Sequence, residues 1–293
     1  MHQFALFLSV FMLSTAPVLV KFLTLEPLVI LVWRLLFVCI LLLPFAYKSL
    51  KSLTISSVKQ VFLVSIVLTV HFWLWFKGIA LLNVSVVAVI FASNPIFTAI
   101  FGYLILREPF KKRYFLAIAM SIIGIYYAFL SQGNAELSVT GTSYILVGSS
   151  LYSLYMVLSK RCRKEMNNGL YTFTLNLGAF ILGLVMFLLT TTFSETSFSS
   201  LYNINIFSYQ MLFLLALMPS VLGHTLMIYS VPFFNLNFIS CLKLLSPLSA
   251  SALGIYFFGD ELSRELIIGF ILVCTGVLFA IPWKRQAKNA VQK

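Results

Sequence analysis

Long apolar runs recur along almost the whole chain, and they leave few folds open to it. Of the 293 residues, 61% are hydrophobic and 10% are charged, with a mean hydropathy of +1.02. Soluble proteins carry about 25% charged residues. Since about 20 apolar residues in a helix cross the bilayer core of about 30 Å, the sequence predicts an all-α polytopic membrane protein. Ten transmembrane helices are predicted, at residues 4–22, 27–46, 58–81, 84–106, 114–130, 143–158, 170–190, 207–231, 234–258 and 266–281.

The residues that interrupt these apolar runs recur after 152 residues. Helix-breaking and polar residues recur in register, in the pairs Asn83 and Asn235, Pro95 and Pro247, Gly102 and Gly254, Glu108 and Asp260, and Gly124 and Gly276. Lipid demands hydrophobicity but leaves the exact apolar residue free, so this pattern is typical of repeated membrane hairpins. We predict two five-helix repeats, residues 1–136 and residues 137–293, the second ending in a short basic tail. Because five is odd, the second repeat is inverted relative to the first.

Lysine and arginine are distributed unevenly between the two sides of the predicted membrane. With the N-terminus in the cytoplasm, fifteen of the 20 basic residues fall in inside loops or in the C-terminal tail, and three fall at outer ends of spans. Cytoplasmic loops are enriched in these residues. The distribution predicts a multi-pass membrane protein with both termini in the cytoplasm. The net charge of +12 is then a topological signal and indicates no nucleic-acid partner, since the basic clusters are short turns.

Inverted repeats are the usual framework of secondary transporters, with a binding site near the membrane midplane. We therefore expect a permease that moves a small-molecule solute by alternating access. A channel and a non-transporting structural or assembly protein are the alternatives. Enzyme, cofactor and metal motifs are missing from the sequence, and Cys39, Cys162, Cys241 and Cys274 lack metal or disulfide spacing. The expected partners are the solute and the lipid bilayer, and the expected assembly is a monomer or a homodimer.

Several motifs of the chain resemble those of a known family. In the first half they are His71 to Trp75, Asn94-Pro95 and Arg107-Glu108-Pro109, and in the second half Pro219 to Thr225, Ser246-Pro247 and Asp260 to Ser263. Together they resemble the two repeats of EamA-type permeases, which belong to the drug/metabolite transporter superfamily. The resemblance covers almost the entire chain. It implies a ten-helix inverted-repeat bundle that moves small metabolites such as amino acids across the bacterial inner membrane.

The ninth span departs from this family pattern. Related sequences commonly carry a glutamate directly before the proline, where this chain has Ser246, and an apolar or small residue where it has Lys243. All eight acidic residues fall in turns or at span ends. A mechanism that depends on a carboxylate inside the membrane is therefore not expected here.

Four basic side chains remain inside predicted spans. Lys243 is expected to bind a carboxylate or phosphate of the solute, because a cation in a span faces the bundle interior or a watery cavity; snorkelling to the cytoplasmic surface is the alternative. Arg34 is either a solute ligand or an anchor for Glu26 or for neighbouring carbonyls. His71 and His224 occupy nearly equivalent positions in the two repeats, and each is either a solute ligand or a structural histidine.

Polar residues beside helix-breaking prolines complete the predicted site. Asn94-Pro95 and Ser246-Pro247 are expected hinges, because proline frees a carbonyl that Asn94, Ser246 or the solute can approach. A fixed kink is the alternative at both. Trp75 lies one turn after His71, and Tyr152 lies on the face of the sixth span that also carries Ser149 and Tyr155. The predicted solute-binding residues are thus Lys243, His71, His224, Asn94, Ser246, Trp75, Arg34 and Tyr152, with hinges at Pro95 and Pro247.

Overall fold

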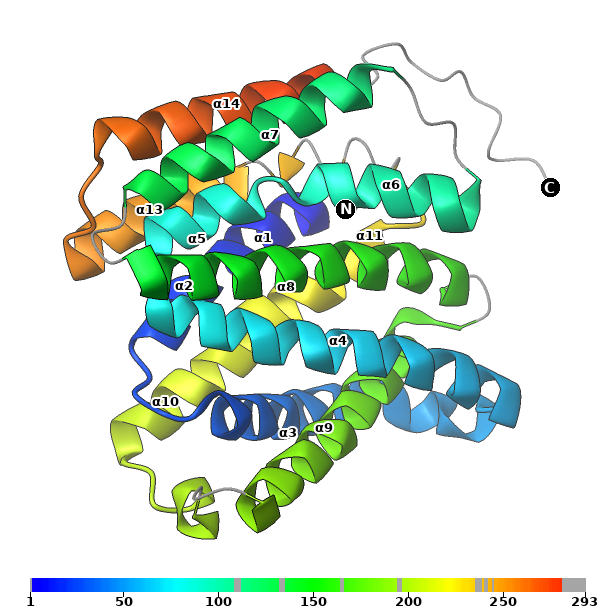
Figure 1. Ribbon diagram of the computed structural model, residues 1–293. Coiled ribbons are helices and arrows are strands. Elements are labelled where there is room, and N and C mark those ends of the chain that lie inside the picture. Colours follow the sequence, from blue (N-terminus) through cyan, green and yellow to red (C-terminus); the bar gives the residue numbers. More distant parts are fainter. Residues whose placement is uncertain are drawn as a thin grey trace.

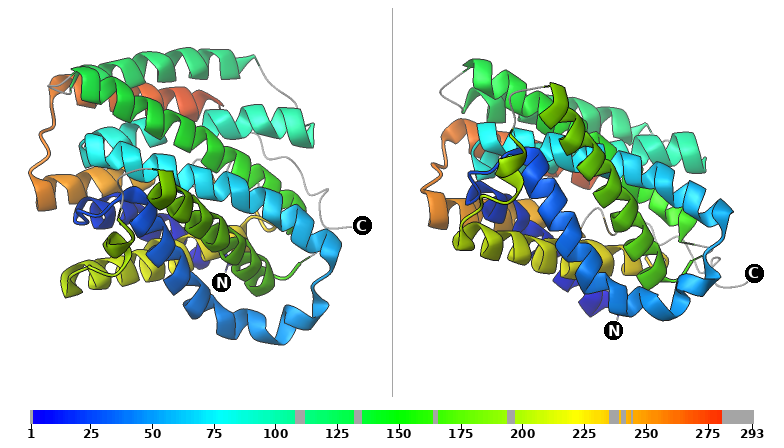
Figure 2. Two further views of the ribbon diagram at one scale, coloured as in Figure 1. Left: turned by 60° about the horizontal axis from the view of Figure 1, so that its bottom comes forward. Right: turned by 90° about the horizontal axis from the view of Figure 1, so that it is seen from below.

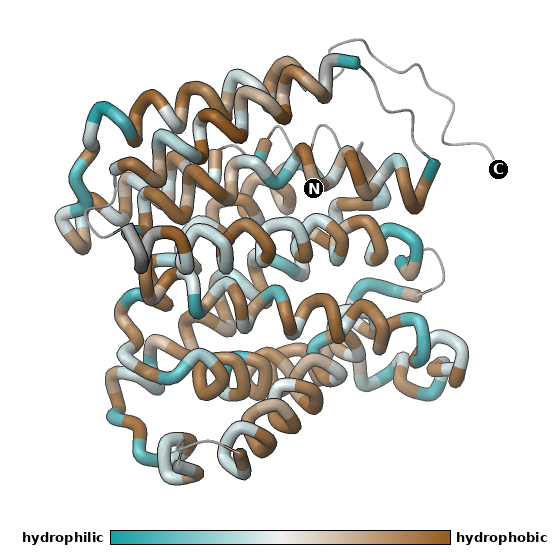
Figure 3. Tube along the Cα trace, in the orientation of Figure 1, coloured by the Kyte–Doolittle hydropathy of each residue, from teal (hydrophilic) through white to brown (hydrophobic). Residues whose placement is uncertain are grey.

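The fold is a bundle of long helices, seen in a computed structural model that describes residues 2–107, 112–131, 135–163, 166–193, 197–234, 239, 242, 243 and 245–280. The described part contains helices and turns and no strand, which confirms the predicted all-α class. Figure 3 shows apolar residues along nearly every helix, with hydrophilic residues gathered at helix ends and turns. That distribution fits a protein whose outer surface faces lipid.

In the first half, α1 (His2–Ser14) and α2 (Ala16–Lys21) form one nearly continuous span, followed by α3 (Pro27–Ala46) and a short 3-10 helix (Tyr47–Ser52). The next helix, α4 (Ile55–Leu81), ends just before Asn83, where the sequence predicts a turn. The fourth span is broken into α5 (Val84–Phe91) and α6 (Asn94–Leu106), and α7 (Arg113–Leu130) follows. The break lies at Asn94-Pro95, as the missing N–H of proline predicts.

In the second half, α8 (Ala135–Cys162) and α9 (Asn168–Phe193) come first, and a 3-10 turn (Phe198–Leu201) follows. The next span runs through α10 (Ile206–Leu215), a π-helical segment (Ala216–Thr225) and α11 (Leu226–Ser230). The last described helices are α13 (Leu245–Phe258) and α14 (Arg264–Ala280). Pro247 therefore lies in the first turn of α13, and Asn235 lies outside the described residues.

Six helical stretches of the described chain are long and apolar enough to cross a membrane, and two shorter apolar helices accompany them. The six are His2–Lys21, Pro27–Ser52, Ile55–Leu81, Val84–Leu106, Asn168–Phe193 and Ile206–Ser230, and the shorter two are Phe115–Leu130 and Leu248–Phe258. The chain is thus a multi-pass membrane protein. The count of ten spans stays a prediction, and so does the division at residue 136.

The predicted sixth span falls on α8, which is longer and more polar than expected. The helix begins at Ala135, so most of the predicted outer loop at residues 133–141 is helical. Ser149, Ser153 and Ser159 of α8 are completely buried. Because α8 packs against α4, α5 and α6, its polar side chains meet other helices instead of lipid, and such a helix does not need a continuous apolar surface.

The two halves of the chain interlock instead of forming separate lobes. Helix α3 packs on α9, α5 on α13 and α7 on α14, while α4 packs on α8 and α1 on the π-helical segment (Figures 1 and 2). If the repeats are equivalent, exchanging each helix for its counterpart in the other repeat leaves the first three pairs unchanged. The same exchange turns the pair of α4 and α8 into the pair of the π-helical segment and α1. This contact pattern supports two equivalent five-helix halves. The inversion of the second half across a membrane stays a prediction.

Helices α7 and α14 approach each other through glycine. A Cβ atom added to Gly124 would lie 2.7 Å from the Gly269 carbonyl oxygen, and one on Gly269 would lie 2.5 Å from the Gly124 oxygen. Gly276, the repeat partner of Gly124, packs in the same interface, where an added Cβ would lie 3.0 Å from the Ala117 oxygen. Small residues of this kind let helix backbones pack closely in membranes.

Gly124→Ala is expected to destabilise the protein by about 1–3 kcal/mol, because neither backbone can yield to the new methyl group. The measurement is denaturant-induced unfolding of the purified protein in detergent. Gly148→Ala is the matched control, since its added Cβ would lie 3.5 Å or more from its neighbours. Equal stability of Gly124→Ala and wild type would show that α7 and α14 separate without cost.

Candidate functional site

Arg34 lies on α3 and is buried in the bundle, with 1% of its surface exposed. Its Nε donates a hydrogen bond to the Ser220 hydroxyl at 2.8 Å, and its guanidinium carbon lies 4.0 Å from the centre of the Phe72 ring. The terminal groups Nη1 and Nη2 have no hydrogen-bond partner among the described residues. The described partner of Arg34 is therefore Ser220, and the predicted alternative of an anchor for Glu26 is not seen.

A proline explains how Ser220 is held in place. Pro219 cannot donate to the Leu215 carbonyl, and in the π-helical segment the Ser220 hydroxyl donates to that carbonyl at 2.9 Å. With its proton used in this way, the hydroxyl oxygen accepts from Arg34 Nε. Ser220 was not among the predicted site residues, although its motif was recognised. It fixes the orientation of the guanidinium.

Lys243 is partly buried, and its ammonium also lies over an aromatic ring. Nζ is 3.9 Å from the centre of the Tyr152 ring and 5.7 Å from that of Phe91. Such cation–π contacts contribute about 0.5–2 kcal/mol. The Lys243 side chain makes no hydrogen bond or ion pair within the described part of the chain. The Lys243 side chain therefore turns into the bundle, as binding of the solute would require.

Both histidines pack against the same tyrosine. The His71 ring on α4 is 5.3 Å from the Tyr152 ring, and the His224 ring on the π-helical segment is 5.7 Å from it. His71 Nδ1 lies 2.7 Å from the Gly148 carbonyl oxygen. Because a carbonyl only accepts, Nδ1 carries the proton of the neutral ring. His224 also packs edge-on against Phe72, with ring centres 5.5 Å apart.

Asn94 connects the break in the fourth span to α8. Its amide Nδ2 donates to the Ser149 hydroxyl at 2.5 Å, and its Oδ1 accepts from the Ser153 hydroxyl at 2.8 Å. The Ser153 hydroxyl also lies 3.0 Å from the Asn94 carbonyl oxygen. These bonds fix the start of α6 against α8. Motion at Pro95 and Pro247 remains a prediction.

All eight predicted site residues line one cavity. Its volume is about 70 Å³, measured as the space open to the centre of a water molecule, which is enough for several waters or part of a small solute. Pro95 also contributes to the wall, and the rest of it is mainly apolar, from Leu13, Ala16, Pro17, Val87, Ala88, Phe91, Ala92 and Ala250. The walls come from both halves of the chain. That is where a transporter built from two repeats carries its site.

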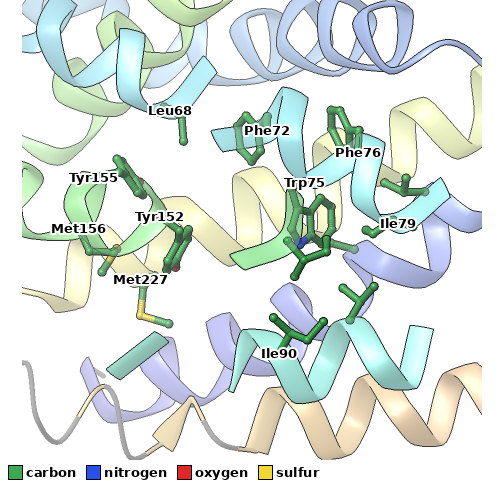
Figure 4. Close-up of a cluster of buried hydrophobic side chains, with 14 of the residues drawn as sticks. Leu68, Phe72, Trp75, Phe76, Ile79, Ile90, Tyr152, Tyr155, Met156 and Met227 are labelled. Carbon is green, nitrogen blue, oxygen red and sulfur yellow. The ribbon is translucent and has the colours of Figure 1, made fainter. Parts of the chain in front are cut away.

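Four buried polar atoms without a hydrogen-bond partner in the described part of the chain lie on these walls. Among the described residues, Arg34 Nη1 and Nη2, Trp75 Nε1 and the Tyr152 hydroxyl are buried without a partner. Figure 4 shows Trp75 of α4 and Tyr152 of α8 projecting into the bundle interior within the aromatic cluster. Buried polar groups are rarely left unpaired unless a ligand or water satisfies them. The cavity is therefore suited to a solute that accepts hydrogen bonds.

The sequence does not distinguish the aromatic rings that support the two cations. Phe72, which carries Arg34, and Phe91, near Lys243, are two of 29 phenylalanines. The adjacency of Phe72 to His71 in the sequence was the available signal.

The described part of the chain contains no group of three or more His, Cys, Asp and Glu side chains that could hold a metal ion.

Together these features define a polytopic membrane protein with a buried, cation-lined cavity between two halves. Comparison with known proteins is more specific. The model of the EamA-like transporter family matches residues 2–130 and again residues 139–281. The chain belongs to the EamA-like transporter family, and the resemblance seen in the sequence is confirmed.

Two relatives carry the name of uncharacterized transporters. An uncharacterized transporter of Clostridium kluyveri is 25% identical over 70% of this chain and 66% of its own length. The uncharacterized transporter YyaM of Bacillus subtilis is 28% identical over 71% of this chain and 67% of its own. The match thus spans about two thirds of these relatives.

A solved structure shares the fold. The crystal structure of a protein 14% identical in sequence superposes with a TM-score of 0.63, covering 95% of this chain and 96% of the other. At this identity the likeness concerns architecture and carries no information about the solute.

Proposed function

We propose that this protein is a secondary transporter that moves a small organic solute across the cell inner membrane by alternating access. The observation that carries the proposal is the cavity lined by both halves of the chain, with the Nη groups of Arg34, unpartnered among the described residues, on its wall and the Lys243 ammonium over the Tyr152 ring. A buried cation without a counter-ion is costly and marks functional positions in membrane proteins. The solute is proposed to supply the missing negative charge. Amino acids, the family's typical cargo by resemblance, are among the candidates that carry one.

Counterflow in vesicles tests transport directly. Purified protein is reconstituted into vesicles preloaded with an unlabelled solute, and uptake of the same labelled solute is followed, with succinate, aspartate, 3-phenylpropionate and phenylalanine tested in turn. A carrier shows uptake accelerated by the internal solute, because the loaded site returns across the membrane. A channel would pass the label without this acceleration. A structural protein would match protein-free vesicles with every compound.

We also propose that both termini lie in the cytoplasm, because the inside loops carry fifteen of the 20 basic residues. In a variant with its four natural cysteines replaced by alanine, Gln286→Cys should resist an impermeant thiol reagent applied to intact cells. Asn203→Cys is the control, because Asn203 is exposed and lies in a predicted outer loop. Outside labelling at position 286 would reverse the proposed orientation.

A further inference from the structure

We propose that the solute is a small organic anion that carries a carboxylate or a phosphate and no ammonium group. This inference rests on the proposed transport function and narrows it. It sets the protein apart from carriers of amino acids and amines, and it follows from the charges and free hydrogen-bonding groups on the cavity wall.

Arg34 presents a ready-made binding edge for an anion. Its Nε donates to Ser220 and its guanidinium carbon lies over the Phe72 ring, so the guanidinium has little freedom to turn. The Nη1 and Nη2 groups stay unpartnered within the described residues, and Arg34 is 1% exposed. A guanidinium held in this way donates two parallel hydrogen bonds to the oxygens of a carboxylate or phosphate.

Two further groups of the wall also favour an acceptor, while the Tyr152 hydroxyl, unpartnered among the described residues, can donate or accept. Trp75 Nε1 can only donate, and it has no partner in the described part of the molecule. Lys243 adds a second cation whose three N–H groups can only donate as well. An organic acid with oxygen atoms along its skeleton would satisfy these groups.

An ammonium group, in contrast, finds no counter-charge there. None of the described lining residues is acidic, and the undescribed residues near Lys243 (235–238, 240, 241 and 244) include no Asp or Glu in the sequence. Aromatic faces can bind ammonium groups, but Phe72 already supports Arg34 and Tyr152 already supports Lys243. A solute ammonium would instead be repelled by two cations in a poorly screened cavity.

Matched pairs of compounds test this inference. Each pair shares a carbon skeleton and differs by one ammonium group: succinate and aspartate, 3-phenylpropionate and phenylalanine, and ethyl phosphate and phosphoethanolamine. Binding to the purified full-length protein in detergent at pH 7 is measured by the ligand-dependent rise of the unfolding temperature. The member without ammonium should bind at least tenfold more tightly. The pair with the tightest binder identifies carboxylate or phosphate as the anionic group.

Two variants examine the roles of the cations separately. Arg34→Gln should weaken binding of the preferred anion at least tenfold, while its unfolding temperature without ligand shows whether the fold is kept. Lys243→Glu places a carboxylate in the cavity and should shift the ratio between the two members of a pair at least tenfold toward the ammonium-bearing member. A variant that is only damaged structurally would lose both members equally.

Some outcomes overturn the inference. These are equal or tighter binding of the ammonium-bearing members, no binding of any of the three anions at millimolar concentration, and an unchanged ratio in a folded Lys243→Glu protein. Counterflow separates this inference from the proposed function. Anions that bind but show no exchange would contradict transport and leave the ligand class standing. Amino acids that exchange while the anions do not would support transport and refute the ligand class.

Discussion

Lys243→Met is expected to reduce counterflow of the transported anion to the level of protein-free vesicles. Removing one partner of a buried charge pair weakens binding by about 2–5 kcal/mol, which is more than tenfold. The unfolding temperature should stay equal or rise, because the Lys243 side chain makes no ion pair or hydrogen bond within the described residues. Methionine keeps the length of the side chain and removes a buried charge.

Lys77→Met is the matched control for this variant. Lys77 also places its ammonium over aromatic rings, 4.3 Å from the centre of Trp73 and 5.5 Å from that of Tyr144, but it does not line the cavity. Counterflow by Lys77→Met should match wild type. If Lys243→Met also transports normally, Lys243 does not bind the solute and Arg34 alone supplies the positive charge.

The candidate site was largely predictable because of a rule that holds inside membranes. Polar side chains in apolar spans turn away from lipid, so choosing the polar residues of the spans also selects those that face the interior. Arg34, His71, Asn94, His224 and Lys243 come from five different parts of the sequence, and the structure places them around one cavity. Whether they bind the solute is what the proposed experiments test.

Contacts between distant residues could not be predicted in the same way. The bond from Arg34 to Ser220 joins residues 186 positions apart, and no local pattern links them. The polar face of α8 is a similar case. Ser149 was placed with Tyr152 and Tyr155 on one face of the sixth span, but its hydroxyl accepts a hydrogen bond from Asn94, and the neighbouring Ser153, which was not singled out, also binds Asn94. Helix-breaking residues were more informative, because Asn83 and Pro95 determine where the helices next to them in the sequence end or begin.

The described wall of the cavity carries an excess of positive charge. This described wall carries two cations, each against an aromatic ring, and it carries no acidic residue. In other carriers a membrane-embedded carboxylate would neutralise such charges and exchange protons during transport. Here the solute is proposed to do the first of these tasks. No acidic residue of the described wall is then present to exchange protons during transport. This bears on whether transport is coupled to a proton gradient.

We expect transport without proton coupling. In vesicles with an imposed pH gradient of one unit at zero voltage, the internal concentration of the transported anion should level off at the external one. One-to-one proton symport would instead produce tenfold accumulation, since one pH unit corresponds to about 1.4 kcal/mol. Protein-free vesicles measure passive entry of the neutral acid. The measurement follows labelled succinate, or the tightest binder of the matched pairs.

The histidines are the groups that could make this expectation fail, because histidine alone titrates near neutral pH unaided. His71 Nδ1 already carries a proton for the Gly148 carbonyl oxygen, so a second proton would have to go to Nε2. On either histidine it would add a third positive charge to the cavity wall beside Arg34 and Lys243, and only the bound anion could offset it. Accumulation that occurs in wild type and vanishes in the His71→Gln, His224→Gln double variant, with counterflow retained, would therefore assign the proton to these two rings and replace uncoupled transport with anion–proton symport.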